Sequence, residues 1–485
     1  MRLLIIALLV CPFLLTAQMQ VGWRTDSYAG INSALLNPAL PGRTPYGWDI
    51  NLGESSFFLA NNYGYLENSS ISSLIRLRNA NDLEVYHRPD LPADLSPNQE
   101  VLVFDFYENN SYYAEHLTQI MGPSFSFRVA PQTRVGLFTR WRTMAHSNNI
   151  DSDLGYYQWN SIPGNQNFTL EEGNIAVAAW GELGLNISQG VETETGNLLI
   201  GASVKRLWGQ RAAYFAITRD FDLNKLSDFS GLESLDFEIE TGFSQNITDT
   251  EEYSNSPGRG WGVDLGMLYQ VDLGDGFYRW EFGLALTDLG GMRFTESEQH
   301  RFTADNLATT LTDNYNNLTA ETLASEAAQQ LSQDIFGDGT ASQIADEFTL
   351  GLPTSLSLQA TYRFQEWAKV EAVYLTGIRV GDASLNRNSV LAIEPRVEHH
   401  WWSVAMPVSM YATDQVRLGL SARLGPVFVG TDQLGSFFRQ NQLDSGDFYI
   451  GLKLFPLGLG DGKNGKRRKG KGRRGKGRDV ECYKF

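Results

Sequence analysis

The sequence predicts an all-β fold, a transmembrane barrel of about fourteen antiparallel strands with an N-terminal plug and a helical loop insert. Residues 261–271 carry the clearest signal. Every second residue from Trp261 to Val271 is apolar, and the positions between them are small or polar except for Leu268. Side chains of a strand alternate between two faces, so this segment has one apolar and one polar face. Repetition of that pattern behind an export signal is typical of a transmembrane barrel.

An export signal is predicted at residues 1–17, with a charged start, an apolar stretch over residues 3–15 and a small-residue cleavage point after Ala17. Export followed by barrel strands predicts the outer membrane of a Gram-negative bacterium, with outer-membrane lipid as the surrounding partner. No later segment approaches the ~18 uninterrupted apolar residues of a membrane helix. After signal removal Cys482 is the remaining cysteine, so no internal disulfide is expected.

The charge of the chain is divided unevenly between a body and a tail. The net charge is −17, yet residues 463–485 hold eleven Lys or Arg and two acids, so the tail carries +9 and the body −26. Residues 457–485 predict a disordered periplasmic tail, because Gly, Lys and Arg cannot bury apolar area. Three interpretations of the basic side chains remain open: contact with anionic lipid, contact with an acidic periplasmic or secretion-complex partner, and simple solvation. The residues concerned are Lys466, Arg467, Arg468, Lys469, Arg473 and Arg474. Nucleic acid is not expected, because both ends of an even-stranded barrel face the periplasm.

The barrel is predicted to span residues 46–456. Strong alternation besides 261–271 occurs at 124–129, 134–141, 175–187, 279–288, 356–364, 416–424 and 448–454. Weaker strands are expected at 47–60, 98–107, 197–208, 213–222, 368–379, 389–400, 402–412 and 426–432. These segments indicate roughly fourteen strands, within the even-numbered range of bacterial barrels.

The connections between these strands fall into two classes. Short turns are expected at Pro131–Thr133, Gly274–Gly276, Gln365–Glu366 and Asp414–Gln415, and long polar connections at 62–97, 147–170, 223–257 and 295–350. Short turns on one side and long loops on the other are typical of an outer-membrane barrel. The longest connection, 295–350, predicts a helical insert with helices over 303–314 and 319–335 that caps one mouth of the barrel.

The inward face of the predicted strands is charged. If the apolar face meets lipid, the inward residues include Arg128, Arg134, Arg140, Glu182, Asp264, Glu281, Arg363, Arg417 and Arg423. They either line a solute path or pair with one another and fill a closed lumen; the second interpretation is favoured. A barrel of this width holds water unless something fills it. We expect residues 18–45, with the turn Asn37-Pro38-Ala39, to form that plug.

Catalysis and metal binding are not supported by the sequence. The six histidines lie at no recognisable motif spacing, and there is no Gly-x-Ser-x-Gly, no paired-cysteine site and no phosphate loop. His399-His400-Trp401-Trp402 fits the end of a strand at the membrane interface better than a metal or lipase site. The acidic residues at 313, 334, 338 and 347 lack the ligand pattern of a calcium loop. We therefore expect a non-enzymatic protein without cofactor or metal.

Several motifs resemble a known group of barrels. Asn37-Pro38-Ala39 before the first strand and Asp288-Leu289-Gly290 at the end of a later one resemble FadL-like barrels and PorV-type barrels linked to type IX secretion. The run from Arg423 to Asp432 and the final strand at 449–456 resemble an uncharacterised Bacteroidota outer-membrane family. The resemblance implies a structural or partner-binding role, linked to type IX secretion or envelope organisation. The alternative that it implies is a FadL-like channel for hydrophobic or small solutes.

Overall fold

The computed structural model describes residues 20–77, 83–92, 101–109, 111–151, 165–226, 231–247, 256–274, 277–310, 323–412, 415–439 and 441–456. The expected signal at 1–17 and the basic tail at 457–485, including Cys482, lie outside the described residues.

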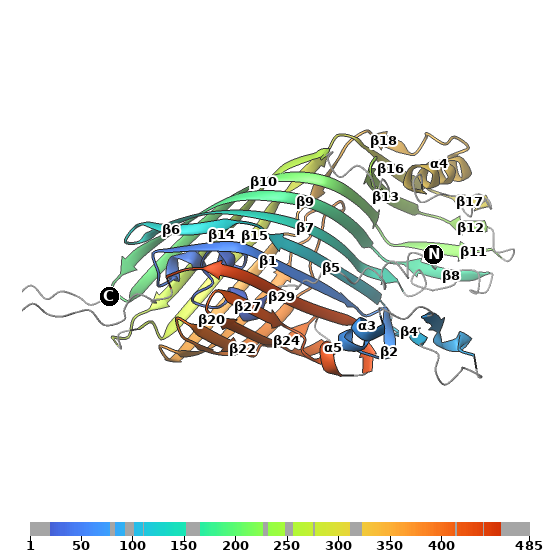
Figure 1. Ribbon diagram of the computed structural model, residues 1–485. Helices are drawn as coiled ribbons and strands as arrows, with labels where there is room; N and C mark the ends of the chain where they lie inside the picture. The colour runs from blue at the N-terminus through green and yellow to red at the C-terminus, as the bar shows by residue number, and fades with distance from the viewer. Residues whose placement is uncertain are drawn as a thin grey trace, which may run out of the picture.

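The described chain forms a closed antiparallel barrel of fourteen wall strands, in which the last strand pairs with the first (Figure 1). Several wall strands are interrupted and consist of two consecutive elements. In order around the wall they are β1 (Trp48–Asn61), β5 with β6 (Ser111–Met121, Ser124–Ala130), β7 (Thr133–Asp151), β9 (Gly173–Thr193), β10 (Gly196–Ile217), β13 with β14 (Phe237–Ser244, Gly258–Val271), β15 with β16 (Trp280–Phe294, Ser297–Ala304), β19 with β20 (Phe348–Gly351, Ser355–Gln365), β21 (Ala368–Gly377), β22 (Val390–Glu398), β23 with β24 (Trp402–Ala405, Val408–Tyr411), β25 with β26 (Gln415–Leu418, Leu420–Leu424), β27 (Val427–Thr431) and β29 (Ser445–Leu454).

The expected strand number is confirmed, although two segments differ from expectation. Residues 197–208 and 213–217, from the two strands expected at 197–208 and 213–222, belong to the single long strand β10, whereas Phe221 and Asp222 begin the separate strand β11 (Phe221–Lys225). The segment expected at 98–107 forms β4 (Val101–Phe106), which lies outside the wall because it pairs with β2 and β3 instead. Its place in the wall is taken by β5, whose polar inward residues, such as Glu115 and Gln119, gave only a weak apolar alternation.

The two ends of the barrel differ, as the loop lengths predicted. At the end that we call the turn end, short connections join β6 to β7, β9 to β10, β20 to β21, β22 to β23 and β26 to β27. The other end, the loop end, carries two small sheets (Figure 1). They are formed by β28 (Asn441–Leu443), β2 (Gly64–Ser69), β4 and β3 (Glu84–His87), and by β17 (Leu307–Thr310), β12 (Gly231–Ser234), β11 (Phe221–Lys225) and β8 (Gln166–Leu170). The turn expected at Asp414–Gln415 connects β24 to β25 and so belongs to the loop end.

The helices in the described residues are few and short. They are α2 (Val21–Arg24), η1 (Gly30–Leu35), η2 (Leu40–Arg43), α3 (Ile71–Leu77), η3 (Arg88–Asp90), α4 (Leu323–Phe336) and α5 (Gly435–Phe438). The helix expected over 303–314 is wrong, because β16 and β17 occupy its described residues and pair with β13 and β12. Helix α4 covers most of the second expected helix and packs beside these strands, with β18 (Gln343–Ala345) following it (Figure 1). Among the described residues, no helix is long and apolar enough to cross a bilayer.

The wall has the two faces that the alternation predicts. On β14, Trp261, Leu265 and Met267 are exposed on the outside, whereas Asp264 is 2% exposed on the inside. Leu268, the exception in the pattern, also points inward and packs in an apolar cluster with Leu36 of the chain's N-terminal segment. The outer surface is therefore suited to lipid and the inner surface to polar contacts.

Candidate functional site

The interior of the barrel near the turn end is filled by residues 20–46, which we call the inner segment. It consists of α2, η1 and η2 joined by turns, and most of its side chains are buried. Its backbone is bound from several sides of the wall. Lys453 on β29 donates to the carbonyl of Ala29 at 2.5 Å, and Arg134 on β7 donates to that of Tyr46 at 2.8 Å. Lys369 on β21 donates to the carbonyl of Thr25 at 2.6 Å, so the segment contacts opposite parts of the wall.

The Asn37-Pro38-Ala39 turn fits a notch in the wall. Asn37 folds its own side chain back to accept from the Ala39 amide at 2.9 Å, and donates outward to the carbonyl of Met267 at 3.1 Å. Two wall glycines, Gly201 on β10 and Gly266 on β14, lie opposite each other in the strand register. A Cβ on Gly201 would lie 2.2 Å from Pro38, and one on Gly266 would lie 2.1 Å from the side-chain oxygen of Asn37. The glycines therefore create the space for the turn.

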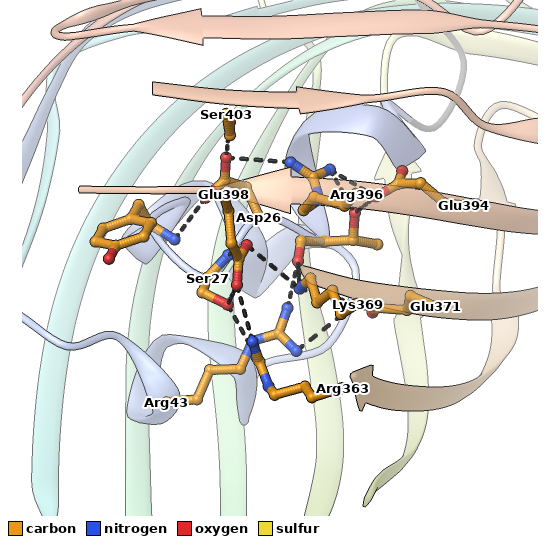
Figure 2. A network of polar contacts seen from close by, with 12 residues as sticks. Asp26, Ser27, Arg43, Arg363, Lys369, Glu371, Glu394, Arg396, Glu398 and Ser403 are labelled. Carbon is orange, nitrogen blue, oxygen red and sulfur yellow. Dashed lines mark hydrogen bonds and ion pairs between the residues drawn. The ribbon is translucent and has the colours of Figure 1, made fainter. Parts of the chain in front are cut away.

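Asp26 is the centre of a buried ionic cluster at one side of the inner segment (Figure 2). Its Oδ2 accepts from Arg396 at 3.1 Å, from Arg423 at 3.4 Å and from the Ser403 hydroxyl. Its Oδ1 accepts from the backbone amide of Tyr28 at 2.7 Å. Burial opposes the charge of Asp26, but Arg423 and Arg396 outweigh it and hold the pKa of this carboxyl below its usual value.

The same cluster extends to Glu398 and to the end of the inner segment. Glu398 accepts from the hydroxyl of Ser27 at 2.6 Å and from Arg363 at 2.9 Å. Lys369 donates to the carbonyl of Thr25 at 2.6 Å, and Arg43 pairs with Glu281 at 3.0 Å. These contacts attach the inner segment to β15, β20, β21 and β22 through charged groups.

A second ionic cluster attaches η1 to the opposite wall. Asp49 on β1 accepts from Lys453 at 2.5 Å, from Arg134 at 2.8 Å and from the backbone amide of Ile31 at 3.0 Å. Gly30 precedes that amide with φ +53°, and a Cβ there would lie 2.5 Å from the Asp49 carboxyl group. Glycine at position 30 thus allows the backbone to approach the carboxylate.

Nearer the loop end, the interior is closed by apolar wall residues and by an inward-folded loop. Residues 378–389, which we call the inner loop, connect β21 to β22. Ser384 forms a bridge with Gly351 of β19, and its carbonyl accepts from Asn174 on β9 at 3.1 Å. Leu385 is fully buried in an apolar cluster whose largest members are Phe58, Tyr113, Met144, Trp180, Tyr214, Phe294, Phe348 and Tyr411. We call this cluster the apolar layer.

Between the inner segment and the apolar layer lies a third ionic cluster around Asp288. Asp288 sits at a β-bulge in β15 with φ +57°, a conformation that is uncommon for a residue with a side chain. Its carboxylate contacts Lys205 at 2.5 Å, Arg142 at 3.0 Å, Arg387 of the inner loop at 3.5 Å and Arg140 at 3.6 Å. The bulge therefore places the Asp288 carboxylate within ion-pair distance of these four basic side chains.

The structure buries all but one of the charged residues that the sequence predicts to face the lumen. Arg134, Arg140, Glu182, Asp264, Glu281, Arg363, Arg417 and Arg423 are buried. Arg128 is exposed where β6 ends, and it donates to the carbonyl of Thr44 at 2.9 Å. Sequence reasoning missed Glu394, Arg396 and Glu398, although their spacing of two along β22 is the signal that identified the others. It also missed Asp288 and the inner loop, because a bulge and a loop leave no period-two signal.

Other candidate sites are not assembled. His399 and His400 are exposed in the turn between β22 and β23, and Arg423 donates to both of their carbonyls. Within the part of the chain that the structure describes, no group of three or more His, Cys, Asp or Glu side chains is placed to hold a metal ion. A cavity of about 10 Å³ lined by Tyr411, Arg417, Asp432 and Asp447 has room for one water-sized molecule.

Comparison with known proteins gives a family and a set of distant barrels. The sequence matches no curated protein. A TodX deltaS2S3 mutant monoaromatic hydrocarbon channel is 11% identical with a TM-score of 0.44, covering 91% of this chain and 99% of that one. The P. putida toluene transporter TodX is 10% identical with a TM-score of 0.38, covering 87% and 92%. A Pseudomonas aeruginosa FadL homologue is 8% identical with a TM-score of 0.23, covering 90% and 97%.

Identities and scores at this level carry no argument about what this chain binds or transports. The family match is stronger, because it extends over most of the wall and includes the Asn37-Pro38-Ala39 turn with the exception of its first residue. Residues 38–432 match the model of DUF5723, and the chain therefore belongs to this family of unknown function.

Proposed function

We propose that this protein is a non-enzymatic outer-membrane channel for small solutes, in which the inner segment is a displaceable plug. The apolar outer face of the wall supports a place in the outer membrane of a Gram-negative bacterium. The inner segment fills the turn end of the lumen, and the inner loop and the apolar layer fill the rest. Transport requires both closures to move. The contacts of the inner segment with the wall suit it to leave the lumen reversibly.

The observation that carries this proposal is the chemistry of the contact between the inner segment and the wall. Apolar side chains of the segment, such as Trp23 and Leu36, pack against the wall. In addition, Asp26, Arg43 and the backbone around Thr25 bind wall residues through ion pairs and charged hydrogen bonds. A permanently filled interior is held at least as well by apolar side chains, because buried ion pairs rarely exceed their desolvation cost. Charged groups have a further property: once the segment leaves, they are solvated and line a water-filled lumen. A fourteen-stranded wall is wide enough for such a lumen.

A reversible cross-link tests whether the inner segment must move. A Cβ on Gly42 would lie 3.4 Å from the Cβ of Ser188 on β9, close to the ~3.5–4.5 Å of a disulfide. The pair Gly42→Cys and Ser188→Cys, in a Cys482→Ser background, locks η2 to the wall. Asp26→Asn with Glu398→Gln loosens the segment, because it removes two carboxylates from the cluster in Figure 2.

Conductance in planar bilayers and solute-driven swelling of liposomes are the readouts. We expect the loosened variant to conduct more than the wild type, the oxidised cross-link in the loosened background to abolish conductance, and reductant to restore it. Glu347→Gln with Glu238→Gln is the matched control, because it removes one carboxylate from each of two exposed ion pairs, with Arg293 and Arg219, outside both closures. Equal conductance of the oxidised and reduced forms, or none in the loosened variant, contradicts the proposal.

A second proposal is a structural or partner-binding role, linked to type IX secretion or envelope organisation. Exposed apolar side chains at the loop end favour it: Leu235, between β12 and β13, is 69% exposed and Phe438 on α5 is 74% exposed. Chemical cross-linking in native membranes, followed by purification and mass spectrometry, should recover a stoichiometric partner. Deletion of residues 463–485 then tests whether the basic tail contributes, since the partner is released only if the tail binds it.

A further inference from the structure

Two closing elements of the barrel bring arginines together in the middle of the lumen. Arg24 lies on α2 of the inner segment, and Arg387 lies on the inner loop. Burial lowers the pKa of Arg24 to about 9; the charges of Arg140, Arg387 and Arg142 add to this effect, and Glu54 opposes it. Burial and the charge of Arg142 likewise lower the pKa of Arg387 to about 10. The four guanidinium groups are therefore close enough to act on one another.

Cations outnumber the carboxylates that pair with them in this region. Arg140, Arg142, Lys205 and Arg387 share three carboxylates, those of Glu182, Asp264 and Asp288. Arg24 adds a fifth positive charge, and within the described part of the chain no carboxylate lies at ion-pair distance from it. Glu54 on β1 is the acid that acts most strongly on Arg24. Its Oε2 accepts from the side chain of Asn32, and its Oε1 has no hydrogen-bond partner among the described residues.

Arg24 and Arg142 present the same unpartnered edge. Both are buried, and in both the Nε and Nη2 atoms have no hydrogen-bond partner within the residues that the structure describes. Arg142 uses its Nη1 for Glu182 and Asp288 and stacks its guanidinium on the ring of Trp180 at 4.6 Å. The Nε and Nη2 hydrogens of an arginine form the fork that binds a carboxylate or phosphate group with two parallel hydrogen bonds. A buried cation with such donors unsatisfied is costly.

We propose that Arg24 and Arg142 bind a small oxyanion, a phosphate, a sulfate or a carboxylate group, where the inner segment meets the inner loop. The oxyanion accepts hydrogen bonds from the two unpartnered edges. Because Arg24 belongs to the inner segment and Arg142 to β7 of the wall, the bound anion fastens the segment in its closed position. This site does not depend on whether the barrel conducts solutes.

Thermal unfolding of the purified full-length protein in detergent tests the site. Phosphate, sulfate and acetate are titrated against chloride at constant ionic strength. Ligand that binds only the folded state raises the Tm with concentration, and the midpoint of the response gives the affinity. Phosphate and sulfate also stabilise proteins generally by exclusion from their surface. Arg293→Gln, which removes an exposed arginine paired with Glu347 at the loop end, measures that general effect.

We expect Arg24→Gln to bind phosphate at least about tenfold more weakly than the Arg293→Gln control, since a charged fork is lost. A response to phosphate and sulfate alone assigns a free tetrahedral anion, whereas an equal response to acetate assigns a carboxylate group. Glu54→Gln keeps Arg24 and removes the competing acid, so it should bind phosphate more tightly than the wild type. If Arg24→Gln does not fold, the affinity of Glu54→Gln for phosphate still tests the proposed site. Identical responses of Arg24→Gln and Arg293→Gln, or an unchanged or weaker response of Glu54→Gln, overturn the proposal.

Discussion

The two halves of the barrel interior are closed by different kinds of contact. Toward the loop end, the apolar layer consists of the wall's own side chains, such as Trp180 and Phe294, with Leu385 from the inner loop. Toward the turn end, a separate segment is held by the ion pairs of Asp26 and Asp49 in addition to apolar contacts, such as the stacking of Trp23 on Phe428. Apolar packing is lost only by creating a cavity, whereas ion pairs exchange for water. The comparison indicates that the closure at the turn end is released more readily than the closure at the loop end.

The largest effect is expected from a cavity in the apolar layer. Trp180 on β9 is fully buried, and Trp180→Ala should lower the free energy of unfolding by about 3–5 kcal/mol. Chemical denaturation in detergent, followed by the loss of β-sheet circular dichroism, measures this change. Trp261→Ala on the lipid-facing surface is the control and should cost much less. If both variants lose the same stability, the apolar layer is not a packed core.

A smaller and more local effect is expected from the ionic half. Asp26→Asn keeps the size of the side chain but removes the charge that binds Arg396 and Arg423, with an expected loss of about 1.5–3 kcal/mol in the attachment of the inner segment. Hydrogen exchange followed by mass spectrometry should show faster exchange over residues 22–35. Exchange in the wall strands β9 and β10 should stay unchanged. Faster exchange throughout the barrel would show that the segment supports the whole fold and is no separate plug.

The space beside Gly201 and Gly266 tests whether steric fit, and not charge alone, positions the inner segment. Gly266→Ala places a Cβ against Asn37 and should cost about 1–3 kcal/mol, because the turn must shift to remove the contact. The cross-link between positions 42 and 188 reports the position of the segment, so its rate of formation should fall. Gly181→Ala is the matched control, since a Cβ at that wall glycine meets nothing within 4 Å. Equal rates in both variants would mean that the turn does not occupy the notch.

Acid should weaken the ionic half while the apolar half persists. The folded-state pKa of Asp26 lies below the usual value of 3.8, so its contribution to stability is complete above that value and disappears as the pH falls through the folded pKa. Hydrogen exchange of the inner segment should therefore accelerate below pH ~4, with little change at neutral pH. Asp26→Asn should reduce the acid dependence of this exchange. A variant with the same acid profile as the wild type would assign the titration to another group.

The alternation along the chain was enough to predict much of the wall. The polar positions between apolar ones on β7, β9, β14, β15 and β26 identified Arg134, Glu182, Asp264, Glu281 and Arg423, all of which are buried. The same spacing on β22 marks Arg396 and Glu398, which were missed although the signal was present. The helix over 303–314 failed for a different reason, because pairing with β12 and β13 overrides a weak local preference.

The sequence by itself determined the fold class, the strand number and the face that each strand presents to lipid, because a period of two is a local property of an extended chain. The tertiary structure decided which charges meet. Asp26 and Arg396 are 370 residues apart in sequence, Gly201 faces Gly266 only through the register of β10 and β14, and a bulge directs Asp288 toward four cations. These contacts depend on barrel closure and strand register, which bring distant segments together and which no local pattern encodes.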